Sequence, residues 1–285
     1  DFVAQSKEEK QRVLTVLEGI TEGIVRNDLY LVDPTTGKPT TWGFWNPAIV
    51  NDNPDSVSER GTNSLEILAY LVSAYSVTGR AIYRDTFDTL VTKHNYIKSC
   101  ANVKIDNPDD DNHSDNELIS LAYHTAFYAC ERLHRGSSAA GVRLSFREEV
   151  CSMSALMLPS AKRSWGLFGG EFSPLWTGVY VGLAKLPAPD TYVSRSVWTL
   201  RAWAIDFVNW PVDTSARMDL TQTPFHARDN AGSREHREIR PPSERAASNW
   251  NTDPFEINQG TGMQDYSPST WDLPYYLMRY YRLLA

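Results

Sequence analysis

Apolar residues recur at the spacing of an α-helix through most of this chain, and this pattern constrains the fold more than any other feature. The predicted helices cover residues 6–27, 57–78, 80–94, 116–134, 144–158, 174–183, 191–210 and 270–284. Ser6 and Glu9 form a capping box at the start of the first helix, and Pro159 is expected to end the fifth. No segment has the alternating pattern typical of a strand, so the sequence predicts an all-α fold.

The predicted helices come in consecutive pairs joined by short turns. Gly79 separates residues 57–78 from 80–94, and a Ser/Ala turn between two glycines separates 116–134 from 144–158. Such pairs are typical of an (α/α) toroid or an incomplete barrel of helical hairpins, in which the loops gather at one rim. No change in composition marks a linker, so we expect one domain over residues 1–285.

Charge and composition exclude several classes of partner. The net charge of −7 argues against general binding to nucleic acid or anionic lipid, and no apolar run approaches the ~20 residues that span a bilayer. Because the chain starts at Asp1 without Met, we expect a secreted protein whose signal peptide has been removed. Cys130 and Cys151 lie on predicted neighbouring helices, where they either form a disulfide or remain buried thiols. The sequence leaves open whether the protein assembles with copies of itself.

A dense polar cluster, residues 109–117, stands where a loop meets the helix predicted from about residue 116. It contains four Asp, one His and one Glu. It does not fit an EF-hand: with Asp106 as the first ligand, Pro108 would take the third position and Asp111 the glycine position. An irregular calcium site made of Asp109, Asp111 and Asp115 stays open, and no other metal or cofactor is expected.

The same cluster supplies candidate catalytic residues. Glycoside hydrolysis needs one carboxyl group that stays protonated and another that is ionised. The candidates are Asp115 and Glu117, followed by Asp111 and Glu59, with His113 as a possible general acid and Asp219 and Asp265 as carboxylates from other loops. A simpler interpretation is that Ser114 or Asp115 is the N-cap of the helix and that Glu117 supports this cap.

Aromatic and polar residues in the loops supply candidate binding groups. Trp42 and Trp45 lie in a loop rich in Pro and Gly, where they either plug the end of a helical barrel or stack on a sugar. The polar stretch 211–270 is longer than a compact domain usually leaves without structure, which indicates function or disorder. The predicted substrate-binding residues are Trp42, Trp45, Asn63, Arg217, Asp219, Asn249, Trp250, Asp265 and Trp271.

Four segments carry a resemblance to known proteins: Trp42–Pro47, Asn63–Leu68, Asp111–Leu118 and Trp271–Tyr281. They resemble parts of helical proteins from polysaccharide-degrading contexts, and the chain as a whole is similar to six-hairpin (α/α) toroid glycosidases and lyases. The resemblance implies a carbohydrate-active enzyme whose partner is an oligo- or polysaccharide. None of the four segments is an established catalytic signature. The chain is short for six complete hairpins, so a truncated or irregular toroid stays an alternative to a complete one.

Three functions follow as alternatives. The first is a glycoside hydrolase with a carboxylate pair at the toroid rim. The second is a lyase acting on uronic acids, in which Arg228 or Arg240 neutralises the substrate carboxylate and Tyr266 or His113 is the base. The third is a protein that binds glycans or assembles without catalysis. The basic loop, residues 228–245, could instead be a surface network in which its arginines pair with Glu235, Glu238 and Glu244. Both enzymatic alternatives require the loops 42–63 and 217–266 to converge on the acidic cluster.

Overall fold

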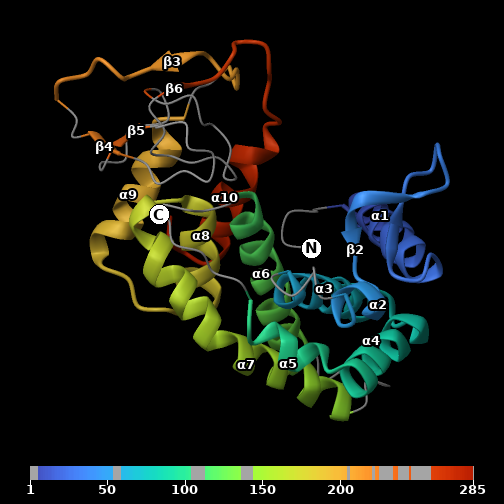
Figure 1. The fold of residues 1–285 in the computed structure, drawn as a ribbon. Helices are drawn as coiled ribbons and strands as arrows, with labels where there is room; N and C mark the ends of the chain where they lie inside the picture. Colours follow the sequence, from blue (N-terminus) through green and yellow to red (C-terminus); the bar gives the residue numbers. More distant parts are fainter. Residues whose placement is uncertain are drawn as a thin grey trace. The chain divides into compact units, whose positions relative to one another are not determined.

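The computed structural model describes residues 6–53, 59–103, 113–135, 144–203, 206–219, 222–224, 234–236, 244 and 258–284 (Figure 1). It is mostly helical, which confirms the predicted all-α class. The chain divides into two compact units. Unit 1 comprises Asp1–Lys104 and Leu121–Ala161, and unit 2 comprises Ile105–Ser120 and Lys162–Ala285. The toroid arrangement and the single domain stay predictions.

Unit 1 holds helices α1 (Lys7–Arg26), α2 (Pro47–Val50), α3 (Arg60–Thr78), α4 (Ala81–His94) and α5 (Tyr96–Cys100), and the hairpin of β1 (Tyr30–Val32) and β2 (Pro39–Phe44). The expected absence of strands is therefore wrong at this loop. Strand β1 has only three residues and the burial of side chains does not alternate along β2, so neither strand shows the alternating pattern. Gly37, at φ 65°, lies in the turn between them. The capping box of α1 is confirmed: the amide of Glu9 donates to Ser6 Oγ, and the amide of Ser6 donates to Glu9 Oε2.

Helix α3 is the centre of unit 1. Helices α1, α2, α4 and α5 pack against it (Figure 1), and most of its side chains from Leu65 to Tyr75 are buried. Gly61 allows its first turn to approach the backbone of residues 102–103, since a Cβ there would lie 2.4 Å from the carbonyl oxygen of Asn102. Gly79 ends the helix in the left-handed conformation at φ 69°, which confirms the predicted hairpin of α3 and α4.

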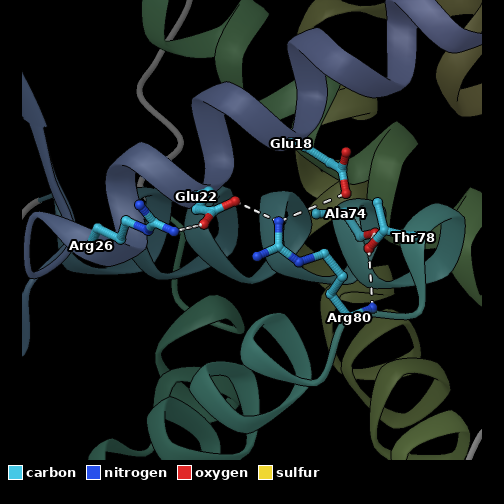
Figure 2. A network of polar contacts seen from close by, with 6 residues as sticks. All are labelled: Glu18, Glu22, Arg26, Ala74, Thr78 and Arg80. Carbon is cyan, nitrogen blue, oxygen red and sulfur yellow. Dashed lines mark hydrogen bonds and ion pairs between the residues drawn. The ribbon is translucent and has the colours of Figure 1, made fainter.

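A network of charged side chains fastens α1 to the start of α4. Figure 2 shows Arg80 reaching from this turn to two carboxylates of α1, with its Nη1 2.5 Å from Glu22 Oε2 and 3.8 Å from Glu18 Oε1. Arg26 pairs with Glu22 from within α1. The hydrogen bond from Arg80 lowers the pKa of Glu22, so Glu22 remains ionised and paired with Arg80 down to a more acidic pH.

Helices α6 (His113–Arg135) and α7 (Leu144–Phe168) form the second predicted hairpin, and both run through the two units. Within unit 1 they are antiparallel neighbours: Ser154 Oγ donates to the carbonyl of Ala126, and Cys130 and Cys151 form a disulfide with a Cα–Cα distance of 5.0 Å. The structure therefore favours the disulfide over two buried thiols. Cys100 of α5 is a buried free thiol.

Removing this disulfide is expected to reduce the free energy of unfolding. The bond closes a loop with a sequence separation of 21, for which loop entropy predicts a contribution of about 3 kcal/mol. The double variant C130S/C151S and the reduced wild type should both show this loss in urea unfolding. Reductant should not affect the double variant, which controls for effects of the reagent. Equal stability of the oxidised and reduced wild type would contradict a structural role of the bond.

Helix α7 continues through Pro159, so the predicted stop at this residue is wrong. Proline removes one backbone donor and usually kinks or ends a helix. Here both flanks are held by tertiary contacts, because Met157 and Ala161 are fully buried and Ser160 Oγ donates to the carbonyl of Ala101. The packing of α7 outweighs the local cost of the proline.

Unit 2 contains η3 (Gly169–Glu171), α8 (Pro174–Thr177), the π-helical η4 (Gly178–Leu183), α9 (Asp190–Arg201) and α10 (Ser269–Tyr280). Gly178 and Gly182 face α10, where added Cβ atoms would lie 2.7 Å and 2.8 Å from Leu277 and Tyr281. The buried hydroxyl of Tyr180 is 3.2 Å from Ser120 Oγ and 2.9 Å from Ser164 Oγ. These contacts join the first turns of α6, the end of α7 and η4 in one polar core.

Two further boundaries in unit 2 differ from the prediction. Helix α9 ends at Arg201, before the predicted end near Trp210, and Phe207 adopts a positive φ of 55° that a helix does not allow. Helix α10 begins at Ser269, one residue before the predicted start, and ends at Tyr280, four residues before the predicted end; Pro268 is its N-cap. The polar stretch that follows α9 forms short antiparallel pairs, β3 (Val212–Asp213) with β6 (Asn258–Gln259) and β4 (Gln222–Pro224) with β5 (Arg234–His236). The expected absence of strands is wrong here as well.

Candidate functional site

The first turns of α6 hold the predicted acidic residues. The helix begins at His113, so Ser114 and Asp115 lie inside it, and the interpretation of either residue as the N-cap is wrong. Asn116 is buried in unit 2, whereas Asp115 and Glu117 are half-buried. A helix N-terminus favours the ionised form of a carboxyl group, and Asp115 is the acidic residue of the first turn.

Glu117 differs from Asp115 in its environment. Desolvation by burial raises the pKa of Glu117 above its ordinary value of 4.5. Residues two positions apart lie about 200° around the helix axis, so Asp115 and Glu117 point to different sides of α6. The two residues therefore cannot form a facing acid/base pair, and a partner for Glu117 must come from another element.

The other predicted site residues of unit 2 that the structure describes take part in separate contacts. Arg217 binds Asp219 through two of its nitrogens and also pairs with Glu244. This ion-pair network raises the pKa of Arg217. Of the glutamates named for a surface network of the basic loop, Glu244 is thus paired with an arginine outside that loop, and the interpretation of the loop itself stays a prediction. Asp265 is exposed and forms a β-bridge with Val208, and Tyr266 is half-buried. Trp271 stacks on Tyr275 at 4.6 Å and donates its indole hydrogen to the carbonyl of Leu200.

The two tryptophans predicted to bind sugars in unit 1 have opposite environments. Trp42 of β2 is 79% exposed, so its ring can stack on a ligand. Trp45 is only 6% exposed and packs edge-on against Tyr70, so the prediction of a sugar platform is wrong for Trp45. Asn63 donates to the carbonyl of Phe44 at 3.4 Å, which makes it a support for this loop. Glu59 is half-buried at the N-cap of α3.

Sequence reasoning missed Glu66, which holds the Trp45 loop in place. Glu66 is 7% exposed on α3 and accepts a hydrogen bond of 2.9 Å from Trp45 Nε1. Burial, followed by the negative charge of Glu66, raises the pKa of Tyr70 to about 12. A glutamate among the apolar positions of a helix is the sequence signal that could have identified this group, because a buried carboxylate needs donors.

Several predicted residues lie outside the described part of the chain: Asp109, Asp111, Arg228, Arg240, Asn249 and Trp250, together with the side chain of His113. Among the described residues, no group of three His, Cys, Asp or Glu side chains is placed to hold a metal ion. No described helix has the length and apolar content needed to cross a membrane. The acidic turn belongs to unit 2 and the loop 42–63 to unit 1, and the convergence of the loops on this turn stays a prediction.

Comparisons with protein families, with curated proteins and with solved structures find no match to this chain.

Proposed function

We propose that this chain is a glycoside hydrolase acting on an oligo- or polysaccharide, with Glu117 as the general acid. The observation that carries the proposal is the environment of Glu117: a half-buried carboxyl group near the start of α6 whose pKa is raised by burial. A glycosidase must keep one carboxyl group protonated near neutral pH so that it can donate its proton to the leaving oxygen.

The ionised partner of Glu117 is assigned to a different element. Asp115 points to another side of α6, and Asp219 is held by Arg217. The remaining candidates are the exposed Asp265, Glu59, and Asp111 of the acidic loop before α6. The exposed indole of Trp42 supports a carbohydrate ligand, since a flat apolar ring at the surface can stack on a sugar.

The test is a product assay on neutral and uronate-containing polysaccharides. Hydrolysis releases new reducing ends without any new absorbance in the ultraviolet. A lyase would release unsaturated products that absorb in the ultraviolet, and that result would replace hydrolysis by elimination. Glycan binding without turnover on the whole panel would contradict both enzymatic proposals and favour a binding protein.

A further inference from the structure

An exposed tryptophan stands on a two-stranded ribbon of unit 2. The ribbon comprises residues 206–213 and 258–266, and it includes the paired strands β3 and β6 (Figure 1). Backbone hydrogen bonds continue the pairing beyond these strands, since the amide of Gly262 donates to the carbonyl of Asn209. The next residue, Trp210, is 54% exposed. It was not among the predicted binding residues, because the sequence indicated a helix up to this position.

The ring of Trp210 is held in one orientation although it is exposed. Its Nε1 donates a hydrogen bond of 2.8 Å to Asp206 Oδ2, and Asp206 Oδ1 accepts a second bond from the amide of Val208. The bond from Trp210 lowers the pKa of Asp206, so this acceptor is ionised at neutral pH. Gly262 lies beside the ring, since an added Cβ there would be 3.6 Å from the Cε3 atom of the indole. An aromatic surface that is fixed before a ligand arrives loses little conformational freedom on binding.

The ribbon around this ring is mostly polar. Its other side chains described as exposed are Asp206, Pro211, Asp213, Thr261, Met263, Gln264 and Asp265. The core of a protein interface is depleted of charged side chains, so this surface does not have the composition of a protein contact. A sugar offers what the ribbon can bind: a flat apolar face for the indole, and hydroxyl groups for the carboxylates, the hydroxyl and the amide.

The charge of the ribbon distinguishes between classes of sugar. Its two segments contain Asp206, Asp213 and Asp265 but no Lys, Arg or His. Hydrogen bonds from Trp210 and Ser215 lower the pKa values of Asp206 and Asp213, respectively, so both carboxylates are ionised at neutral pH. Three negative charges repel the carboxylate of a uronic acid and do not act against a neutral sugar. The ribbon therefore favours a neutral saccharide.

We propose that Trp210 is a stacking platform for a neutral saccharide and that Asp206 is the positioning residue that fixes its ring. The inference rests on the proposed function and narrows its substrate to neutral polysaccharides. Asp265 connects the two: it pairs with Val208 across the ribbon, two positions from Trp210, and it is a candidate for the ionised partner of Glu117. A sugar on the indole would thus lie on the same ribbon as a candidate catalytic carboxylate.

The test is calorimetric titration of the full chain carrying Glu117→Gln, in which the proposed hydrolysis is suppressed. The ligands are cellohexaose, mannohexaose, xylohexaose and hexagalacturonate. At least one neutral hexasaccharide should bind, with an affinity that salt does not change because no ion pair forms, and hexagalacturonate should not bind. Adding Trp210→Ala should weaken the binding at least about tenfold, whereas Trp210→Phe should retain most of it because a flat ring remains.

The role of Asp206 is tested by two substitutions. Asp206→Ala should weaken the binding several-fold because the ring is no longer fixed. Asp206→Asn should restore most of the affinity, since its amide oxygen can still accept the indole hydrogen. Met218→Ala is the matched control: it shortens an apolar side chain of unit 2 that is 97% exposed and lies outside the ribbon, and it should leave the binding unchanged. Circular dichroism checks that each variant is folded.

Equal affinities of the Trp210→Ala and Met218→Ala variants would overturn the proposal, and so would the absence of binding to all three neutral hexasaccharides. Binding of hexagalacturonate that Trp210→Ala abolishes would overturn the selection of a neutral sugar. A dimer in solution that Trp210→Ala converts into a monomer would also contradict the platform, since the ring would then be a contact between copies of the chain.

The platform and the hydrolase can fail separately. Binding of a neutral sugar that depends on Trp210, without release of reducing ends by the wild type, would support the platform and contradict the hydrolase. Release of reducing ends from a neutral polysaccharide that Trp210→Ala does not slow would support the hydrolase and contradict the platform.

Discussion

Replacing Glu117 with glutamine is expected to lower the turnover of a glycoside substrate by at least about 100-fold, the usual contribution of a general acid. The amide has nearly the same shape but cannot donate the proton. The effect should depend on the leaving group: a glycoside with an acidic phenol needs little protonation and should lose much less activity. Steady-state kinetics on two aryl glycosides of different leaving-group pKa would measure this difference.

The pH dependence provides a second readout for Glu117. Its pKa is raised, so the protonated and active form persists above the ordinary value of 4.5 and activity should fall as the pH rises through the raised pKa. The free energy of unfolding depends on pH in the same direction. It is not reduced by Glu117 below pH 4.5, and it falls as the pH rises through the raised pKa, because the carboxyl group then ionises in a desolvated environment. At neutral pH the Glu117→Gln variant should therefore be at least as stable as the wild type.

Two variants serve as controls for Glu117→Gln. Glu148→Gln changes an exposed glutamate of α7 and should leave turnover unchanged. Asp115→Asn changes the neighbouring carboxylate on another side of α6, and its effect separates the roles of the two residues. If Glu117→Gln retained wild-type turnover on poor leaving groups, Glu117 would not be the general acid.

Replacing Gly61 with alanine is expected to reduce the free energy of unfolding by more than about 3 kcal/mol. The new Cβ would lie 2.4 Å from the carbonyl oxygen of Asn102 and 2.7 Å from the Cα of Val103, and both are backbone atoms that cannot rotate away. Helix α3 would have to move away from residues 102–103, which would disturb the centre of unit 1. Chemical denaturation of the purified variant would measure the loss.

Gly19 provides the matched control for Gly61. It also lies inside a helix, but no atom lies within 4 Å of the position of its Cβ. Alanine at position 19 should stabilise the protein by about 0.5 to 1 kcal/mol, because glycine is a poor helix former. If Gly61→Ala stabilised the protein in the same way, the close approach of α3 to residues 102–103 would not exist in solution.

Features coded by a few neighbouring residues could be predicted from the sequence. The capping box of Ser6 and Glu9 marks the start of α1, and Gly79 marks the turn between α3 and α4, because each uses a local hydrogen bond or backbone conformation. The antiparallel hairpin of α6 and α7 followed from apolar spacing, and it brought Cys130 next to Cys151.

Features that depend on distant contacts could not be predicted in this way. Pro159 looks like a stop until the packing of its neighbours and the bond from Ser160 to Ala101 are known. Trp45 looks like an exposed loop residue until Glu66, which is 21 positions away, accepts its indole hydrogen. In the candidate site, the sequence identified Glu117 as a candidate acid. It could not show that Glu117 is partly buried, and this burial raises its pKa.

The thiol of Cys100 gives the protein an internal reporter. Cys100 is fully buried on α5, which packs against α3, and burial raises its pKa far above that of a free thiol. Both features make it inert toward alkylating reagents while the two helices stay together. With the other two cysteines joined to each other, Cys100 is the one free thiol of the chain, and the rate of its chemical labelling would follow the opening of the structure around α5.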